Sequence, residues 1–260
     1  MNQNKQGRRS LTLISLLHYY KLVFRSLLFL VTLGFCIFRR PDNAAELFTS
    51  IDTMPVILAV IWLLFFVEMF LRFFPSRFES MGCQKQFAKN YIPAEKEGRP
   101  GEENHGVWLV VLSWIGLNAV IGGLYYAHII DECILLLISL AYSVCDMICI
   151  LFFCPFQTWM MKNKCCGSCR IYNWDYAMMF TPLIFVRTWY TWSLLGLGVL
   201  LLITWELFHL RHPERFSETT NACLACKNCP EKLCHHKTQL HRFWTREKQR
   251  LQTKLKKFDN

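Results

Sequence analysis

The stretch CILLLISLAYSVCDMICILFF, residues 133–153, has the length and composition of a membrane-spanning helix. A helix rises about 1.5 Å per residue, so roughly twenty apolar residues cross the ~30 Å of hydrocarbon in a bilayer. Two acidic residues, Asp131 and Glu132, precede the stretch, and a basic loop follows it. Because basic segments stay on the cytoplasmic side, we expect the acidic end of this helix to face outward.

Four other apolar stretches lie around this one, at residues 22–38, 55–74, 107–130 and 176–210. Hydrophobic residues make up 53% of the 260-residue chain and charged residues only 18%, a balance that excludes an ordinary soluble domain. Each stretch is long enough for a helix that crosses a bilayer. The predicted fold is therefore all-α: a polytopic transmembrane helical bundle with five spans. A shorter apolar stretch, residues 11–20, is expected to be an interfacial lead-in to the first span.

The last apolar stretch, residues 176–210, does not fit a single upright span. Its 35 residues would form a helix of about 50 Å, whereas two full spans need about 40 residues and a turn. A sixth span, short or re-entrant, would place the residues that follow inside, and a single span would place them outside. Twelve of the 29 Lys and Arg residues lie in residues 211–260, which favours the inside. Three breaks are expected, at Thr181-Pro182, at Arg187 and at the Gly196/Gly198 pair.

The chain divides into a transmembrane helical domain, residues 1–210, and a basic, cysteine-rich tail, residues 211–260. The tail ends in an amphipathic pattern that begins at Lys237 and ends at Phe258. A basic amphipathic helix suits the anionic headgroups of a bilayer, and it equally suits packing as a solvated helix on its own protein. Nucleic acid is not expected as a partner of this basic tail, because a membrane surface is already present.

The tail carries a close group of cysteines. Cys223, Cys226 and Cys229 lie at every third position, so three thiolates converge on one centre when the backbone curls around it. This core is typical of iron–sulfur binding loops, and a 4Fe–4S cluster is the expected cofactor. Zinc or another soft metal is the alternative, and uncoordinated thiols or a disulfide are the third interpretation. Three further residues are placed to complete a metal site: Cys234, His235 and His236.

A second group of cysteines lies between the fourth and the last apolar stretches. Cys165, Cys166 and Cys169 follow Cys154, which gives four soft ligands within sixteen residues. Lys and Arg residues in this loop favour the thiolate forms that metals bind. Because basic loops are expected in the reducing cytoplasm, closely spaced thiols there favour metal or redox chemistry over disulfides. The alternative is a cysteine-rich interfacial loop that binds no metal.

The segment CPFQTWMMKNKCCGSCRIYNWDYAMMFTPL, residues 154–183, resembles a stretch of uncharacterised bacterial cysteine-rich integral membrane proteins. The resemblance implies a multi-pass protein of the bacterial inner (plasma) membrane, and it supplies no catalytic residue. The charge pattern adds that the N-terminus and the tail are cytoplasmic. Aromatic residues of this segment also fit an interfacial belt: Trp159, Tyr172, Trp174 and Tyr176.

Ionisable residues inside the apolar stretches are costly in lipid and need partners. Asp146 lies well inside the fourth stretch, and Arg187 in the last stretch is its expected partner. This pair favours either an interhelical clamp or a proton or cation path. Glu68 and Arg72 are four residues apart, so we expect them to pair on one helix face. The histidines do not pair at one depth, so haem is not expected.

These patterns favour a membrane-bound redox protein whose iron–sulfur clusters pass electrons at the inner membrane to a redox partner protein. One alternative is a zinc-stapled scaffold or partner-docking protein. The other is a transporter of a soft metal ion or small solute, with Asp146 and Cys149 lining the path. The chain lacks a phosphate-binding glycine loop, a nucleophile elbow and an H-E-x-x-H motif, which argues against a hydrolase or an ATP-driven pump. Whether the protein is an enzyme stays open.

Overall fold

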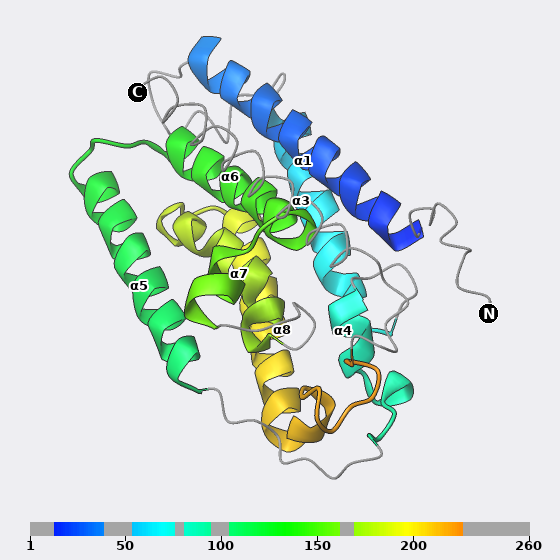
Figure 1. The fold of residues 1–260 in the computed structure, drawn as a ribbon. Helices are drawn as coiled ribbons and strands as arrows, with labels where there is room; N and C mark the ends of the chain where they lie inside the picture. Colours follow the sequence, from blue (N-terminus) through cyan, green and yellow to red (C-terminus); the bar gives the residue numbers. More distant parts are fainter. Residues whose placement is uncertain (1–12, 39–53, 76–80, 95–103, 162–168, 226–260) are drawn as a thin grey trace, which may run out of the picture.

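The chain folds into a bundle of helices (Figure 1). The computed structural model describes residues 13–38, 54–75, 81–94, 104–161 and 169–225. Within these residues the only β-type pairing is an isolated bridge between Pro93 and Asn221. The same residues contain five long helices: α1 (Leu13–Phe38), α3 (Met54–Leu71), α5 (Asn104–Tyr126), α6 (Glu132–Leu151) and α8 (Trp189–Arg211).

Four of the described segments are long and apolar enough to cross a membrane: Leu16–Phe38, Gly106–Tyr126, Glu132–Leu151 and Trp189–Arg211. Helix α3 adds a shorter apolar helix, Leu58–Leu71. Large apolar side chains such as Trp108 and Leu112 on α5 are exposed on the outside of the bundle, as they are on helices that face lipid. The prediction of an all-helical chain with apolar helices of membrane-spanning length is therefore confirmed, and the count of five spans stays a prediction.

Short elements connect the long helices at one end of the bundle and between α6 and α8. They are α4 (Met81–Gln86), η1 (Ala88–Asn90), η2 (Phe156–Met160), η4 (Arg170–Trp174), α7 (Asp175–Phe180), η5 (Thr181–Phe185) and η6 (Pro213–Arg215). Short helices leave many backbone groups without a partner inside the helix, and lipid cannot supply one. Polar side chains from other segments are therefore needed to hold these elements.

Helices α1 and α6 lie side by side and run antiparallel. A disulfide joins Cys36, near the end of α1, to Cys133, near the start of α6. Further along the pair, the Arg25 guanidinium donates from Nη1 to the backbone carbonyl of Ser143 at 3.1 Å. The rings of Tyr19 and Phe152 meet edge to face near the other end.

The start of α1 differs from the sequence-based expectation. The lead-in and the first span form one continuous helix, Leu13–Phe38, and its stretch of membrane-spanning length and composition begins at Leu16, earlier than expected. The interfacial location of residues 11–20 stays a prediction. The apolar residues of the lead-in and those of the span join without a helix-breaking residue between them, so the helix continues through both.

The last apolar stretch breaks at two places. At Thr181-Pro182 the α-helical turns of α7 give way to the 3-10 turns of η5, and residues 186–188 then separate η5 from α8. Thr188 and Thr191 form a capping box at the start of α8, which satisfies backbone N–H groups that a helix start leaves open. Of the three predicted breaks, the first two are confirmed, and the glycine pair lies inside α8.

The core lies where α3, α6, α7 and α8 meet. Phe65 of α3 and Phe180 of α7 are both buried, and their rings meet edge to face with centroids 5.2 Å apart. A Cβ on Gly198 would lie 3.3 Å from the backbone nitrogen of Ala177. The missing side chain therefore lets α8 approach α7 closely, as small residues do between membrane helices.

The two ends of the bundle differ, and we name each for the state of its cysteines. The disulfide end is where α1 and α5 end and where α6 and α8 begin. Phe185 of η5 packs there against Tyr125 and Tyr126 of α5. The thiol end is the opposite one, where α6 and α8 end, and it includes residues 81–94 and 212–225.

Candidate functional site

The tail begins at the thiol end and is fixed there by hydrogen bonds. Asn221 is fully buried, and its side-chain nitrogen donates to the carbonyls of Lys85 at 3.0 Å and Arg215 at 2.9 Å. The backbone of Ala222 donates to Ile92 at 2.8 Å. Because the side chain of Asn221 satisfies carbonyls from two different segments, it sets the position at which the cysteine-rich tail leaves the bundle.

Cys223 is the first of the predicted tail ligands and is placed by this anchor. Its backbone N–H donates to the side-chain oxygen of Asn221 at 3.0 Å, and its reduced thiol donates to the carbonyl of Asn90 at 3.0 Å. The thiol is thus held against the segment 84–94. The other tail residues predicted as ligands lie outside the described residues: Cys226, Cys229, Cys234, His235 and His236.

The second cysteine group also reaches the thiol end. Cys169 is reduced and buried, in an apolar cluster with Val107 and Met161. The next residue, Arg170, forms an ion pair with Glu206 of α8 at 2.6 Å, and the Trp174 indole donates to the same carboxylate at 2.7 Å. These contacts fix η4 on the last turns of α8. The predicted ligands Cys165 and Cys166 lie outside the described residues.

One segment contacts both groups. Asn173 of η4 donates to the side chain of Gln86 at 2.8 Å, and both residues are buried. The carbonyl of the neighbouring Lys85 accepts from Asn221. Residues 84–94 therefore join the loop that carries Cys169 to the start of the tail that carries Cys223, although the two cysteines are far apart in sequence.

Cys154 has partners at the end of α6. Its sulfur accepts the backbone N–H of Gln157 at 3.4 Å and is hydrogen-bonded to the thiol of Cys149. Helix α6 ends at Leu151, so the chain turns back and brings the two thiols together. These contacts tie Cys154 to α6.

Metal binding by the predicted ligands stays a prediction. Among residues 13–38, 54–75, 81–94, 104–161 and 169–225, no three or more His, Cys, Asp or Glu side chains are grouped so as to hold a metal. Most of the predicted ligands lie outside those ranges. Those that the structure describes, Cys154, Cys169 and Cys223, are reduced thiols, and thiol sulfur is the donor that soft metals and iron–sulfur clusters prefer.

A buried ionic cluster lies deeper in the bundle, centred on Arg25 of α1. Arg25 is almost completely buried and pairs with Glu68 of α3 at 2.5 Å and with Asp146 of α6 at 3.4 Å. Lys21 also pairs with Glu68, at 3.2 Å, and the Tyr176 hydroxyl donates to that carboxylate at 3.0 Å. The Glu68 carboxylate thus has three donors, which together offset the cost of burying its charge.

The predicted pairing of Glu68 with Arg72 is wrong. Arg72 instead pairs with Asp175, the first residue of α7, at 2.7 Å, and its guanidinium lies over the ring of Tyr176. Arg72 follows Leu71, the last residue of α3, and each of the two side chains meets a partner from another helix. Both residues are buried, so the helices that pack around them decide which partners they meet.

The predicted partner of Asp146 is also wrong. Arg187 is exposed between η5 and α8, toward the disulfide end, and Asp146 pairs with Arg25 instead. The sequence held a signal for this pairing: an arginine within an apolar span faces the bundle interior and meets an acid there. Arg25 lies within the first apolar stretch and fits that rule better than Arg187, which lies at a break of the last stretch.

The formal charges that the ion pairs of the ionic cluster bring together cancel within the described residues. Three basic residues, Lys21, Arg25 and Arg72, meet three acidic ones, Glu68, Asp146 and Asp175. They come from α1, α3, α6 and α7, so the cluster joins four helices. This arrangement supports the clamp interpretation of Asp146 over a proton or cation path, because its carboxylate is already engaged by Arg25.

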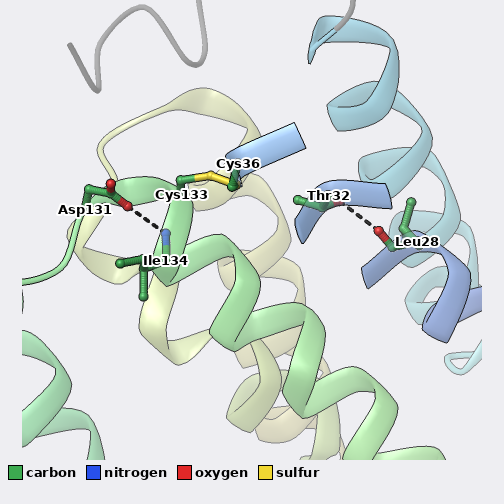
Figure 2. Close-up of a disulfide and its surroundings, with 6 residues drawn as sticks. All are labelled: Leu28, Thr32, Cys36, Asp131, Cys133 and Ile134. Atoms are coloured by element: carbon green, nitrogen blue, oxygen red, sulfur yellow. Dashed lines mark hydrogen bonds between the residues drawn. A yellow bond between two sulfur atoms is a disulfide. The ribbon is translucent and has the colours of Figure 1, made fainter. Parts of the chain in front are cut away.

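The disulfide between Cys36 and Cys133 was not predicted. Its Cα atoms are 6.3 Å apart and its cysteines are 97 residues apart in sequence. Figure 2 shows the bond between the last turn of α1 and the first turn of α6, beside Asp131. Asp131 caps α6, because its carboxylate accepts the backbone N–H of Ile134 at 2.9 Å.

Comparison of the chain with protein-family models, with curated proteins and with solved structures found no match. The resemblance of residues 154–183 to bacterial cysteine-rich membrane proteins therefore stays a prediction.

Proposed function

We propose that this chain is a multi-pass membrane protein whose thiol end binds a soft metal centre, an iron–sulfur cluster first among the candidates, and passes electrons at the cytoplasmic face of a bacterial inner membrane. Cys223, Cys226 and Cys229 would hold the cluster, with Cys234 or a neighbouring histidine as the fourth ligand. When bound, such a cluster takes up and gives back single electrons.

One observation carries the proposal. The two cysteine groups predicted as ligands are more than fifty residues apart in sequence, yet Cys169 of one group and Cys223 of the other lie at the same end of the bundle. Residues 84–94 contact the loops of both. Cysteines from two distant parts of the sequence at one end of the bundle would supply the soft sulfur ligands that a metal-based electron-transfer centre needs.

The distribution of charge supports a cytoplasmic location for this end. Twelve of the 29 Lys and Arg residues lie in the tail, residues 211–260, which begins at the thiol end. Basic segments are retained in the cytoplasm, which is reducing and keeps thiols available for metals. The helix predicted from Lys237 to Phe258 would lie on anionic headgroups beside the centre and leave its outer face to a redox partner.

The test is metal and sulfide analysis of the full-length protein purified without oxygen. We expect iron and acid-labile sulfide in comparable amounts, and a brown colour that fades on reduction. Cys223→Ser and Cys226→Ser should each lose most of the iron. The matched control is Cys145→Ser, which removes a reduced, exposed thiol of α6 outside both groups and should leave the iron content unchanged.

A zinc-stapled scaffold is the second candidate, and the packing of the tail favours it. Asn221 already fastens residues 212–225 to residues 84–94, and a structural zinc in the tail would extend the same attachment. A colourless protein with stoichiometric zinc and no sulfide would support this candidate and end the electron-transfer proposal. A protein with neither metal contradicts both.

Transport of a soft metal or small solute has less support. The path predicted for it included Asp146 and Cys149, but the first is paired with Arg25 and the second with Cys154. Groups that already have partners inside the bundle are poor ligands for a passing ion.

A further inference from the structure

We infer that the bond between Cys36 and Cys133 is formed by a thiol oxidant outside the cytoplasm, so that the disulfide end of the bundle faces an oxidising compartment and the thiol end a reducing one. The inference concerns a covalent site to which the proposed function assigns no role. It does not depend on whether a metal binds at the thiol end.

The disulfide joins two cysteines that lie near helix ends. Cys36 is two residues from the end of α1, and Cys133 is the second residue of α6. Cys133 therefore lies in the first turn of α6, close to its N-cap residue Asp131, and the bond holds Cys36 at the same level of the bundle. A bond at this level is within reach of a protein oxidant in the aqueous compartment on that side, and a bond in the middle of the bilayer would not be.

The other described cysteines differ from this pair in their oxidation state. Cys145, Cys149, Cys154, Cys169 and Cys223 are all reduced, and the last four lie at the thiol end. Cys149 and Cys154 are close enough for their thiols to be hydrogen-bonded, yet they form no disulfide. Two cysteines thus lie close together at each end of α6, and of these two pairs the one at the disulfide end is oxidised. A difference between the two compartments accounts for this contrast.

The distribution of Lys and Arg residues supports the same orientation of the bundle without reference to the cysteines. Of the 29 Lys and Arg residues, three belong to segments of the sequence that connect helices at the disulfide end: Arg39, Arg40 and Arg187. The turn between α5 and α6 has no Lys or Arg and contains Asp131. The charge rule therefore places the disulfide end outside the cytoplasm. This is the side on which the disulfide requires an oxidising compartment.

The chemistry balances with a disulfide as the oxidant. The thiolate of one cysteine attacks the disulfide of an oxidant protein, and the thiolate of the other then displaces that protein from the mixed disulfide. Cys36 and Cys133 lose two electrons and two protons in total, and the oxidant protein is released with two thiols. The reaction needs no metal of this chain.

The bond also holds α1 in register with the ionic cluster. Within the described residues α1 packs mainly on α6, and many of its apolar side chains are exposed. The helix is therefore fixed at two points: by the disulfide near its end and by Arg25 about three turns earlier.

The first experiment counts thiols on the full-length protein, unfolded in detergent without reductant and treated with a maleimide that adds a visible mass. Cys36→Ser should carry one adduct more than the wild type, because it frees Cys133. The control Cys145→Ser should carry one adduct fewer. Mass spectrometry of a non-reduced digest should find the peptide of Cys36 joined to that of Cys133. One adduct fewer in Cys36→Ser would overturn the inference, because it shows that Cys36 was reduced.

The second experiment locates the two ends with a membrane-impermeant maleimide on intact bacterial cells. Ile129 in the turn before α6 and Trp159 in η2 at the thiol end are matched, with exposed fractions of 67% and 68%. Ile129→Cys should be labelled in intact cells, and Trp159→Cys only after the cells are permeabilised. The wild type provides the background. The opposite pattern would overturn the assignment of the compartments, even if iron is bound at the thiol end.

Discussion

The two ends of the bundle are built by different means. At the disulfide end, a covalent bond, a capped helix start and aromatic packing around Phe185 hold long, regular helices together. At the thiol end, short helices and turns are held by buried amides and ion pairs, among them Asn173, Asn221 and Glu206. At the disulfide end the long helices satisfy their own backbone except at their starts, which Asp131 and the Thr188/Thr191 capping box hold, whereas the short elements of the thiol end depend on side chains from distant segments.

The disulfide end contributes stability, whereas the thiol end holds the sulfur atoms that the proposed chemistry needs. At the disulfide end the covalent bond uses up the thiols of Cys36 and Cys133, while the polar contacts of the thiol end hold reduced sulfur in place. The ionic cluster lies between the two ends, nearer the thiol end, since Glu68 is three residues from the end of α3. Substitutions in all three regions test this comparison.

The largest effect is expected from Glu68→Gln in the ionic cluster. Without this carboxylate, Arg25 and Lys21 lose their main buried partner, which costs about 3–5 kcal/mol in comparable cases. Detergent-solubilised protein should unfold at a clearly lower temperature or denaturant concentration. The control Glu132→Gln, at the partly exposed start of α6, should cost less than about 1 kcal/mol. Equal losses for the two variants would show that the cluster contributes no special stability.

The second effect tests the disulfide end. The double variant Cys36→Ser/Cys133→Ser should lose about 2–4 kcal/mol of unfolding free energy, because the bond closes a long loop in the unfolded chain. Denaturant unfolding with and without reductant measures it. Reductant should weaken the wild type by a similar amount and leave the double variant unchanged. An unchanged wild type would mean that the disulfide end does not depend on its covalent bond.

The third effect compares two adjacent glycines of α5. A Cβ on Gly122 would overlap the ring of Phe185, whereas one on Gly123 would meet nothing within 4 Å. Gly122→Ala should therefore cost about 1–3 kcal/mol by overpacking, and Gly123→Ala should be neutral or slightly stabilising. Thermal unfolding of both variants checks the difference. If both behave alike, the aromatic packing at the disulfide end is looser than described.

The fourth effect concerns the thiol end. Glu206→Gln removes the charge that Arg170 and Trp174 share, but the pair is partly exposed, so a loss of about 1 kcal/mol is expected. The informative measurement is the reactivity of Cys169, which is buried next to Arg170: its maleimide labelling rate should rise as η4 loosens. A labelling rate equal to that of the wild type would show that Glu206 does not hold this loop.

The smallest effect is expected at His128, where α5 ends. His128 has a φ of 57°, in the left-handed region, and Ile129 donates to the carbonyl of Leu124 at 3.0 Å, as in a glycine-ended helix. His128→Gly should stabilise the protein by up to about 1 kcal/mol, since glycine adopts this φ without strain. A small rise in unfolding temperature checks it. A fall would show that the imidazole makes a contact that outweighs the strain.

Much of the fold could be predicted from the sequence, because the signals for helices and for their breaks lie within short stretches of the chain. Long apolar stretches indicate helices of membrane length, and the Thr181-Pro182 break shows where such a helix cannot continue. The predicted start of α6 agrees with the structure to within one residue. The predicted start of α1 does not, because an apolar lead-in and a span look alike when the chain continues as one helix.

The candidate site could be predicted only in part. Spacing identified Cys169 and Cys223 as members of two groups, but spacing does not say that residues 84–94 would bring them to one end. The pairing of Cys36 with Cys133 could not be predicted either, since the two cysteines are 97 residues apart and neither belongs to a close group. Proximity between distant segments has no local signature.

The sequence by itself determined that this protein is helical and suited to a membrane, because backbone hydrogen bonding and the burial of apolar side chains depend on composition over about twenty residues. Only the tertiary structure decided that Arg25 meets Glu68 and Asp146, and that Cys36 meets Cys133. Charges and thiols act over a few ångströms, so their partners are chosen by the helix packing that brings them together.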